Sequence, residues 1–332
     1  MKQSVWLLLL TVFALSIGYI AFGANYFSTI SGIQESKDSG DVEKSPKLQQ
    51  TGVVKDLKLR ENSGIDFSIR YEDALWMHND SGEPPVLFLV GTDGKTLAEC
   101  SVFRAANLDW EDICSFQWQG KSYVAVGDVG DNLKKRTSCQ LYLIEEPKVE
   151  LNHQRSVAHT ILKHQKIDFK YEDGPKNCEA IAFDPRTRSF WLVEKIYQEV
   201  SHQEIPGVYQ LKLNDDLTAE SGVAKRISDY PVRNVTGMDL HDDRLVVRNY
   251  AFAHLVHIDG DWEKAFSEKR FDNVALPIQR QGEAICFSPE GDAVFVASEL
   301  TRQPLYRIKL SDQKSKSETS HNPSPESISN AK

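Results

Sequence analysis

The stretch Asn177–Lys195 reads NCEAIAFDPRTRSFWLVEK, and a second stretch, Gln281–Glu299, reads QGEAICFSPEGDAVFVASE. Both place a glutamate before a short apolar strand, which leads through a polar turn to a second, more apolar strand. Gly, Pro, Asp and Ser at such breaks are typical of hairpin turns. The two stretches therefore predict β-hairpins that recur along the chain.

Three further segments follow the same pattern, namely NSGIDFS from Asn62, DWEDICS from Asp109 and VTGMDLH from Val235. The five copies are spaced by roughly 45 to 68 residues, an interval typical of propeller blades. A third strand follows each hairpin, and a more polar fourth strand closes each unit, as in TLAECSV at residues 96–102. The repeat predicts an all-β fold: a β-propeller of five blades, or of six if the long second interval holds another blade.

The two ends of the repeat region complement each other. The last copy lacks a fourth strand because the chain turns polar after Leu310, whereas TGVVKDLKL, from Thr51, precedes the first copy without a partner. Pairing the two would remove the exposed sheet edges of an open ring. We therefore expect the N-terminal strand to close the ring and the propeller to span residues 51–310.

The termini have a different composition. Residues 1–24 are mostly apolar and are long enough to span a bilayer, but they also end in small residues that resemble a signal-peptidase site. Cleaved signal peptide and membrane anchor both remain open, and both predict an extracytoplasmic protein, periplasmic or secreted, that meets the membrane only through this segment. Residues 25–50 and 311–332 contain too few apolar residues to fold, and we expect a disordered linker and tail.

Charge and cysteine content exclude several classes of protein. The net charge of −9 and pI near 5.5 argue against a nucleic-acid partner. The five cysteines are too far apart for a zinc or redox motif, and the odd number leaves at least one free thiol in the monomer that we expect. Cys114 and Cys286 occupy equivalent places in the repeat, where small buried residues are expected.

Acidic residues gather at the strand ends. Because the first strand of each blade lines the channel, acids at its start should converge on the axis. We take Glu111, Asp112, Glu179 and Glu283 as the catalytic candidates. The metal-ligand candidates are Asp66, Asp80, Asp128, Asp131, Glu194, Asp239 and Glu299.

Carboxylates packed this closely stay ionised only when a positive charge compensates them, and hard oxygen ligands without paired histidines favour calcium as the cofactor. The alternative is that each acid accepts hydrogen bonds from loop amides, as most Asp residues at strand ends do. Glutamate is a poor turn residue, yet it recurs at one repeat position as Glu111, Glu179 and Glu283. For the set as a whole we therefore favour the cation site.

Several motifs together resemble a known group of proteins. RAANLDWEDI (104–113), GDVGDN (127–132) with Arg136, EAIAFDP and QGEAICFSPEG resemble a family of exported bacterial propellers, which is similar to esterase-like phytase propellers and to gluconolactonase-type propellers. The resemblance covers about Gly64 to Leu310. On the phytase side it implies calcium in an acidic cleft and a small anionic phosphoester substrate, with Arg136, Lys195 and Arg248 as substrate contacts.

Two classes of function remain open. One is a metal-dependent hydrolase of phosphoesters, and the other is a non-catalytic propeller that binds a ligand or an envelope protein. The chain contains neither a G-x-S-x-G elbow nor an H-E-x-x-H motif. Among its histidines, His78 is the best placed for acid–base work, but a lone histidine at a strand end is more often structural.

Overall fold

The computed structural model describes residues 48–152, 154–197, 204–268 and 271–310. All of them belong to one compact unit, Ser45–Lys332. The segment expected to be a signal peptide or anchor, most of the expected linker and the expected tail lie outside the described residues. Within the described ranges, no helix is long and apolar enough to cross a membrane.

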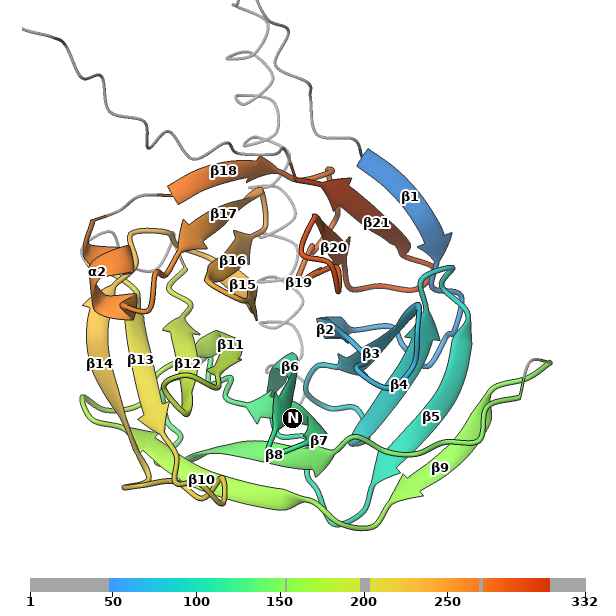
Figure 1. Cartoon of the computed structure of the whole chain (residues 1–332), viewed down its shortest axis with the longest axis horizontal. Coiled ribbons are helices and arrows are strands. Elements are labelled where there is room, and N and C mark those ends of the chain that lie inside the picture. Colours follow the sequence, from blue (N-terminus) through green and yellow to red (C-terminus); the bar gives the residue numbers. More distant parts are fainter. Residues whose placement is uncertain (1–47, 153, 198–203, 269–270, 311–332) are drawn as a thin grey trace, which may run out of the picture. The chain divides into compact units, whose positions relative to one another are not determined.

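Five four-stranded blades form the fold, which confirms the predicted β-propeller (Figure 1). Blade 1 contains β2 (Asn62–Phe67), β3 (Ala74–Asn79), β4 (Val86–Gly91) and β5 (Thr96–Val102). Blade 2 contains β6 (Trp110–Trp118), β7 (Lys121–Asp128), β8 (Cys139–Glu145) and β10 (Gln165–Tyr171). Blade 3 contains β11 (Cys178–Asp184), β12 (Ser189–Glu194), β13 (Gly207–Lys212) and β14 (Val223–Asp229).

Blade 4 contains β15 (Val235–His241), β16 (Arg244–Asn249), β17 (Phe252–His257) and β18 (Phe271–Ala275), with the short helix α2 (Trp262–Ser267) before its last strand. Blade 5 contains β19 (Ala284–Phe287), β20 (Ala293–Ala297), β21 (Pro304–Lys309) and β1 (Leu48–Val53). The inner strands β2, β6, β11, β15 and β19 contact one another in that order, and β19 returns to β2. The ring is therefore complete with five blades.

The N-terminal strand closes the ring as expected. β1 pairs antiparallel with β21, from Leu48 opposite Ile308 to Val53 opposite Pro304. The strand begins at Leu48, three residues before the predicted start at Thr51. Residues 48–50, which we had placed in the linker, thus belong to blade 5, because their backbone groups pair with β21.

The long second interval holds a transferred strand and no sixth blade. β9 (Val157–Ile161) leaves blade 2 and pairs in parallel with β5 at the outer edge of blade 1. The chain then returns to blade 2, where β10 pairs with β8. At Lys170 and Tyr171, β10 also pairs in parallel with β14, which links blades 2 and 3.

The hydrophobic core lies between the blades. Five clusters of buried side chains fill the five interfaces between neighbouring blades. The interface between blades 5 and 1, for example, packs Ile65 and Met77 against Ala284 and Phe295. All five cysteines are buried and none forms a disulfide. Cys114 and Cys286 lie in the core, as expected.

Candidate functional site

Four of the five inner strands begin with an irregularity that directs one side chain toward the channel. The pairing register shifts between residues 62 and 64 in β2, 110 and 112 in β6, 178 and 180 in β11, and 235 and 237 in β15. Such β-bulges re-aim a side chain and are frequent beside functional sites. The residues at the bulges are Ser63, Glu111, Glu179 and Thr236, and Glu283 immediately precedes β19.

Glu111, Glu179 and Glu283 therefore occupy one position of the repeat in blades 2, 3 and 5, as the sequence predicted. They are only 3%, 4% and 4% exposed. Buried carboxylates require compensating partners. The groups around the three glutamates therefore determine which ligand could bind at this end of the channel.

A compact group of carboxylates lies at Glu111. One oxygen each from Asp80, Asp109 and Glu111 lies within 4.8 Å of the others. Asp80 follows β3 and Asp109 precedes β6. Between them, the Asn107 side-chain amide donates to the backbone oxygens of Asn79 (3.1 Å) and Asp80 (2.7 Å), which holds the two loops together. We call Asp80, Asp109 and Glu111 the acidic triad.

The Gly127–Asn132 loop, GDVGDN, passes directly over the acidic triad. A Cβ atom at Gly130 would overlap Oε1 of Glu111 and lie 2.5 Å from Oδ2 of Asp109. The Gly130 amide also donates to the Asp109 backbone oxygen at 3.2 Å. The glycine in this motif is thus explained by close approach of the backbone to the carboxylates.

The acidic triad carries a strong excess of negative charge. Burial, with the nearby charges of Asp109, Glu179 and Glu283, raises the pKa of Asp80 to about 7. Burial and the charge of Glu179 raise the pKa of Glu111 well above its usual value. A bound cation would relieve this repulsion by stabilising the ionised carboxylates.

A buried ion pair lies beside the triad. Nζ of Lys195 is 2.9 Å from Oε2 of Glu179, and the Asn177 amide donates to the other Glu179 oxygen at 2.9 Å. The ammonium also lies 5.2 Å from the ring centre of Tyr197 and 5.0 Å from that of Tyr250. Burial works to lower the pKa of Lys195, but the charges of Glu179 and Glu283 outweigh it and raise the pKa. Lys195 therefore stays protonated.

The three predicted anion contacts are engaged within the protein. Arg136 pairs with Asp128 at 2.8 Å and donates to the backbone oxygens of Gly130 and Asp128, so that it clamps the GDVGDN loop. Arg248, 1% exposed, donates to the backbone oxygens of Ala284 and Ala297. Lys195, 3% exposed, is held by Glu179. An anion at the mouth would therefore depend on another source of positive charge.

Four predicted metal ligands lie outside the acidic triad and bond to other protein groups. Asp128 is bound by Arg136, and Asp131 accepts from the Arg136 backbone amide at 2.6 Å. Glu194 pairs with Lys134 at 2.9 Å, and Glu299 accepts from the Gln281 amide at 2.5 Å. Burial and the charges of Glu283 and Asp80 raise the pKa of Glu299 to about 8.

Asp66, Asp112 and Asp239 lie deeper in the channel and join the blades. Asp112 accepts from its neighbour Ile113 and, across the channel, from the backbone amides of Ile181 (2.9 Å) and Met238 (3.2 Å). Asp66 accepts from Ser115 of blade 2, and Asp239 accepts from Phe287 of blade 5, each through a backbone amide. These contacts assign all three a structural role, so we remove Asp112 from the catalytic candidates and Asp66 and Asp239 from the metal ligands.

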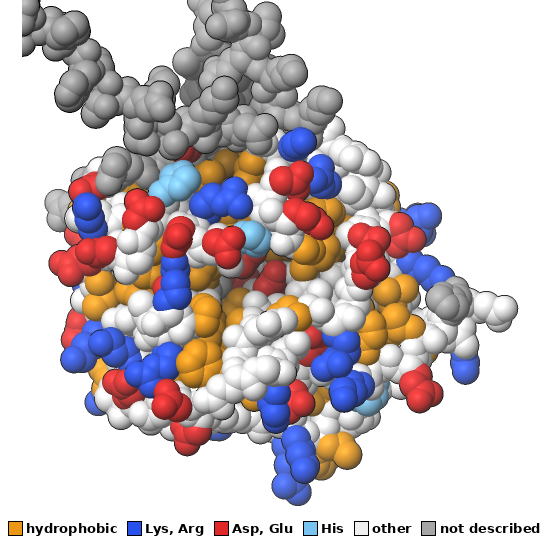
Figure 2. Space-filling model, viewed as in Figure 1, with side chains coloured by type: hydrophobic (Ala, Val, Ile, Leu, Met, Phe, Trp, Pro, Cys, Tyr) orange, Lys and Arg blue, Asp and Glu red, His pale blue; other side chains and the backbone are white. Residues whose placement is uncertain are grey.

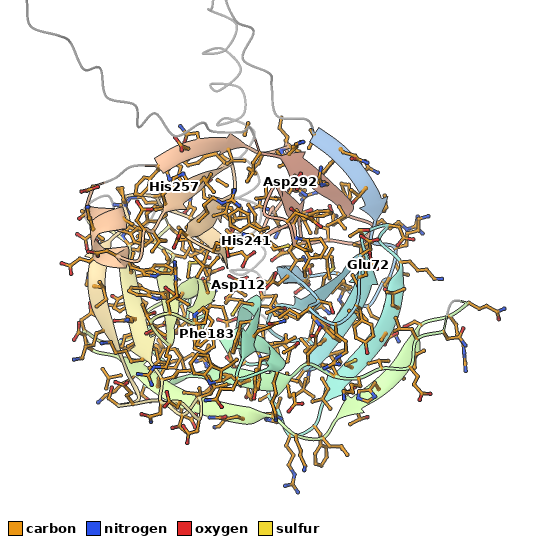
Figure 3. All side chains as sticks on the ribbon, viewed as in Figure 1. Glu72, Asp112, Phe183, His241, His257 and Asp292 are labelled. Carbon is orange, nitrogen blue, oxygen red and sulfur yellow. The ribbon has the colours of Figure 1, made fainter. Side chains whose placement is uncertain are left out.

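The bulges also correct the alignment of the repeat. Asp112 directly follows its bulge and corresponds to Gly64, Ala180, Gly237 and Ala284. Asp66 and Asp239 come two residues later, at the level of Cys114 and Cys286. Small residues at the level of Asp112 leave room for its carboxylate on the axis, and Figure 3 shows Asp112 close to the centre of the ring.

The acidic triad, with Glu179 and Glu283, marks one end of the channel, where the inner strands begin. Figures 2 and 3 look onto the opposite face, where β15 ends at His241 and a hollow lies near the centre. His78 is buried beside the inner strands and not at either mouth, with Nδ1 3.0 Å from the Asn79 backbone oxygen. Burial lowers the pKa of His78 to about 4, so it stays neutral and is unsuited to acid–base work.

Sequence analysis missed Asp109 as a site residue. It begins the DWED motif, but only the fold shows that its side chain meets Asp80, which lies 29 positions earlier in the chain. Ser63 was also missed, and its hydroxyl donates to Oε2 of Glu111 at 3.4 Å. Its equivalence to the glutamates appears only when the strands are aligned by their bulges.

No protein-family model and no curated protein matches the chain. Among solved structures, it is similar to a putative oxidoreductase (glucose dehydrogenase) of Thermus thermophilus, with 10% identity over 80% of this chain and 100% of that one, at a TM-score of 0.43. It is also similar to a chain of the nidogen/laminin complex, with 10% identity over 72% and 73% and a TM-score of 0.42. Hydrazine synthase of Kuenenia stuttgartiensis matches with 9% identity over 71% and 68%, at a TM-score of 0.39.

Proposed function

We propose that the protein binds a divalent cation at the acidic triad and that the bound ion recruits an anionic ligand, with hydrolysis of a phosphoester as the activity. The observation that carries the proposal is the convergence of Asp80, Asp109 and Glu111, whose oxygens lie within 4.8 Å of one another beside two further buried glutamates. As predicted from the N-terminal segment, we place the protein outside the cytoplasm.

Calcium fits the donor set best. All three side chains offer carboxylate oxygens, and calcium takes six to eight oxygens in flexible geometry. Three protein ligands leave positions for water and for an oxygen of the ligand. Zinc and copper prefer histidine or cysteine, and the acidic triad contains neither; His78, two residues before Asp80, is buried and bonded to a backbone oxygen.

The charge balance supports both the ion and an anionic ligand. Six carboxylates act on one another at this mouth, those of Asp80, Asp109, Glu111, Glu179, Glu283 and Glu299. Lys195 and Arg248 offset only part of this charge. Because both cations already contact protein groups, an anionic ligand would bind through the metal, which can also polarise a phosphoryl oxygen.

A non-catalytic propeller is the second candidate, with an anionic ligand or an envelope protein as its partner. The observation in its favour is that Lys195, Arg136 and Arg248 are all bonded within the protein, so that no described side chain among the predicted anion contacts is available to a transferring phosphoryl group. Binding through the ion alone needs none of them.

The cation site is tested by calcium titration calorimetry and by thermal melts with EDTA and with calcium. Calcium should raise Tm, because the ion binds only the folded state. Glu111→Gln should lower the calcium affinity at least tenfold, since it removes a buried charged ligand. Glu150→Gln, at an exposed position, is the matched control and should bind calcium as the parent protein does. A Tm that neither EDTA nor calcium changes would contradict the proposal.

The activity is tested with a phosphatase, phytase, nucleotidase and lactonase panel, with and without calcium. Calcium-dependent release of phosphate that Glu111→Gln abolishes would support the hydrolase. Calcium binding without turnover of any substrate would favour the non-catalytic propeller. Turnover that survives both EDTA and Glu111→Gln would refute the assignment of the site.

A further inference from the structure

We propose that Lys195 is an internal counterion that fills a second cation position, between Glu179 and Glu283, so that the channel mouth takes one divalent cation and not two. This inference rests on the proposed function, because it concerns the stoichiometry of the same site. According to this inference, a single side chain determines whether the site binds one ion or two.

The ammonium of Lys195 is held where a metal ion would otherwise be needed. Lys195 directly follows β12, and its backbone amide donates to the Asn177 oxygen at 2.8 Å, which fixes the start of the side chain. Nζ then reaches Oε2 of Glu179 at 2.9 Å. Nζ also lies 5.0 Å from the ring centre of Tyr250, and Glu283 is close enough for its charge to act on the ammonium.

The walls of this position offer oxygen ligands. Oε2 of Glu283 has no hydrogen-bond partner, although the residue is only 4% exposed. The side-chain amide of Gln279, 7% exposed, likewise has no partner, and the Cβ atom of this residue lies near Gly282, which precedes Glu283. Buried polar groups without partners are rare and indicate a ligand, ion or water. Glu179 and Glu283 thus provide two buried carboxylates beside the ammonium.

Removing only the positive charge would leave two carboxylates buried without compensation, which is strongly unfavourable. Protonation or a second cation must then supply the charge. Lys195→Met keeps most of the length and the apolar stem of the side chain while deleting the ammonium. In the parent protein, by contrast, the tethered ammonium is always present and excludes a free ion from the position.

The experiment is calcium titration calorimetry on four proteins: the parent, Lys195→Met, Lys195→Arg and the double variant Lys195→Met/Glu179→Gln. We expect one ion for the parent and for Lys195→Arg, two for Lys195→Met, and one again for the double variant. The double variant separates a new site from a general change in the fold. If the parent binds one ion, then one ion bound by Lys195→Met, or two by the double variant, would overturn the inference.

Failure of the proposed function gives a different result. If the parent binds no calcium, the triad is not a cation site, but a single ion bound by Lys195→Met would still support the counterion role of Lys195. Should Lys195→Met be unfolded in EDTA, circular dichroism follows its refolding as calcium is added. Recovery with calcium supports the inference, and a chain that stays unfolded overturns it.

Discussion

At the channel mouth, the neighbouring side chains limit which residue each position can hold. Gly130 shows this most clearly, since a Cβ atom there would overlap Glu111 and crowd Asp109. Its contribution is to let the GDVGDN loop cover the triad without displacing either carboxylate. The residue is therefore a sensitive probe of the site.

Gly130→Ala should weaken calcium binding by tenfold or more, because the new methyl group pushes the carboxylates of Glu111 and Asp109 away from Asp80. Calorimetry measures the affinity. The control is Gly120→Ala, in the β6–β7 turn, where a Cβ meets nothing within 4 Å but the positive φ of 76° strains the backbone. We expect it to lower Tm with unchanged calcium affinity, and equal calcium binding by both variants would contradict the role of Gly130.

Asp112 is the opposite case, a residue whose importance is structural. Asp112→Asn removes one of the two carboxylate oxygens that accept three backbone amides, from Ile113, Ile181 and Met238. At least one buried amide then loses its acceptor, which costs roughly 1–3 kcal/mol. Denaturant unfolding should show this loss, while calcium affinity should stay within about threefold of the parent protein. A large loss of affinity without loss of stability would return Asp112 to the site.

Among the structural elements, β1 and β9 show how the ring is held together. β1 completes blade 5 across the longest sequence separation in the fold, and Val54 and Leu59, just after it, are buried between blades 5 and 1. β9 crosses from blade 2 to the edge of blade 1 and pairs with β5. β9 joins two blades through backbone hydrogen bonds, whereas β1 completes blade 5 and the chain that follows it leads into blade 1.

Deleting residues 48–53 should destabilise the whole propeller. The deletion exposes the edge of β21 and removes a strand whose pairing closes the ring. We expect a fall in Tm of at least 10 °C by calorimetry, with one unfolding transition. Deletion of 311–332, which removes none of the described strands, is the control. An unchanged Tm for the first deletion would show that β1 is dispensable.

The sequence could predict those strands that leave a local pattern, but not those that depend on pairing with a distant segment. The five hairpins and the closing strand were predicted because each leaves a local pattern, as in NCEAIAFDPRTRSFWLVEK. β9 was missed because nothing local says that Val157–Ile161 pairs with another blade. The sequence predicted that the acids gather at the channel, but not which of them face the mouth. A one-residue bulge places Glu111 at the mouth, whereas Asp112 accepts hydrogen bonds from backbone amides inside the channel.

At the scale of the whole molecule, the five blades bring like charges together at one end of the channel. No single blade carries the acidic triad, since Asp80 comes from blade 1 whereas Asp109 and Glu111 come with blade 2. Folding therefore concentrates carboxylates that are far apart in the unfolded chain. The free energy of this concentration should depend on pH and on any ion that compensates it.

Without calcium, Tm should fall as the pH rises from 6 to about 9. Burial and neighbouring charges raise the pKa of Asp80 to about 7 and that of Glu299 to about 8, whereas both carboxyls have ordinary values in the unfolded chain. A group whose pKa is raised by folding binds its proton more tightly in the folded state, so its stabilising contribution is complete at low pH and is lost as the pH rises through the folded value.

Saturating calcium should flatten the profile, because the ion replaces those protons as the compensating charge. Calorimetric melts at several pH values, with EDTA and with calcium, measure both curves. Glu299→Gln should reduce the slope in EDTA above pH 7, and a Tm that rises with pH in EDTA would show that the carboxylates at the mouth are compensated within the protein.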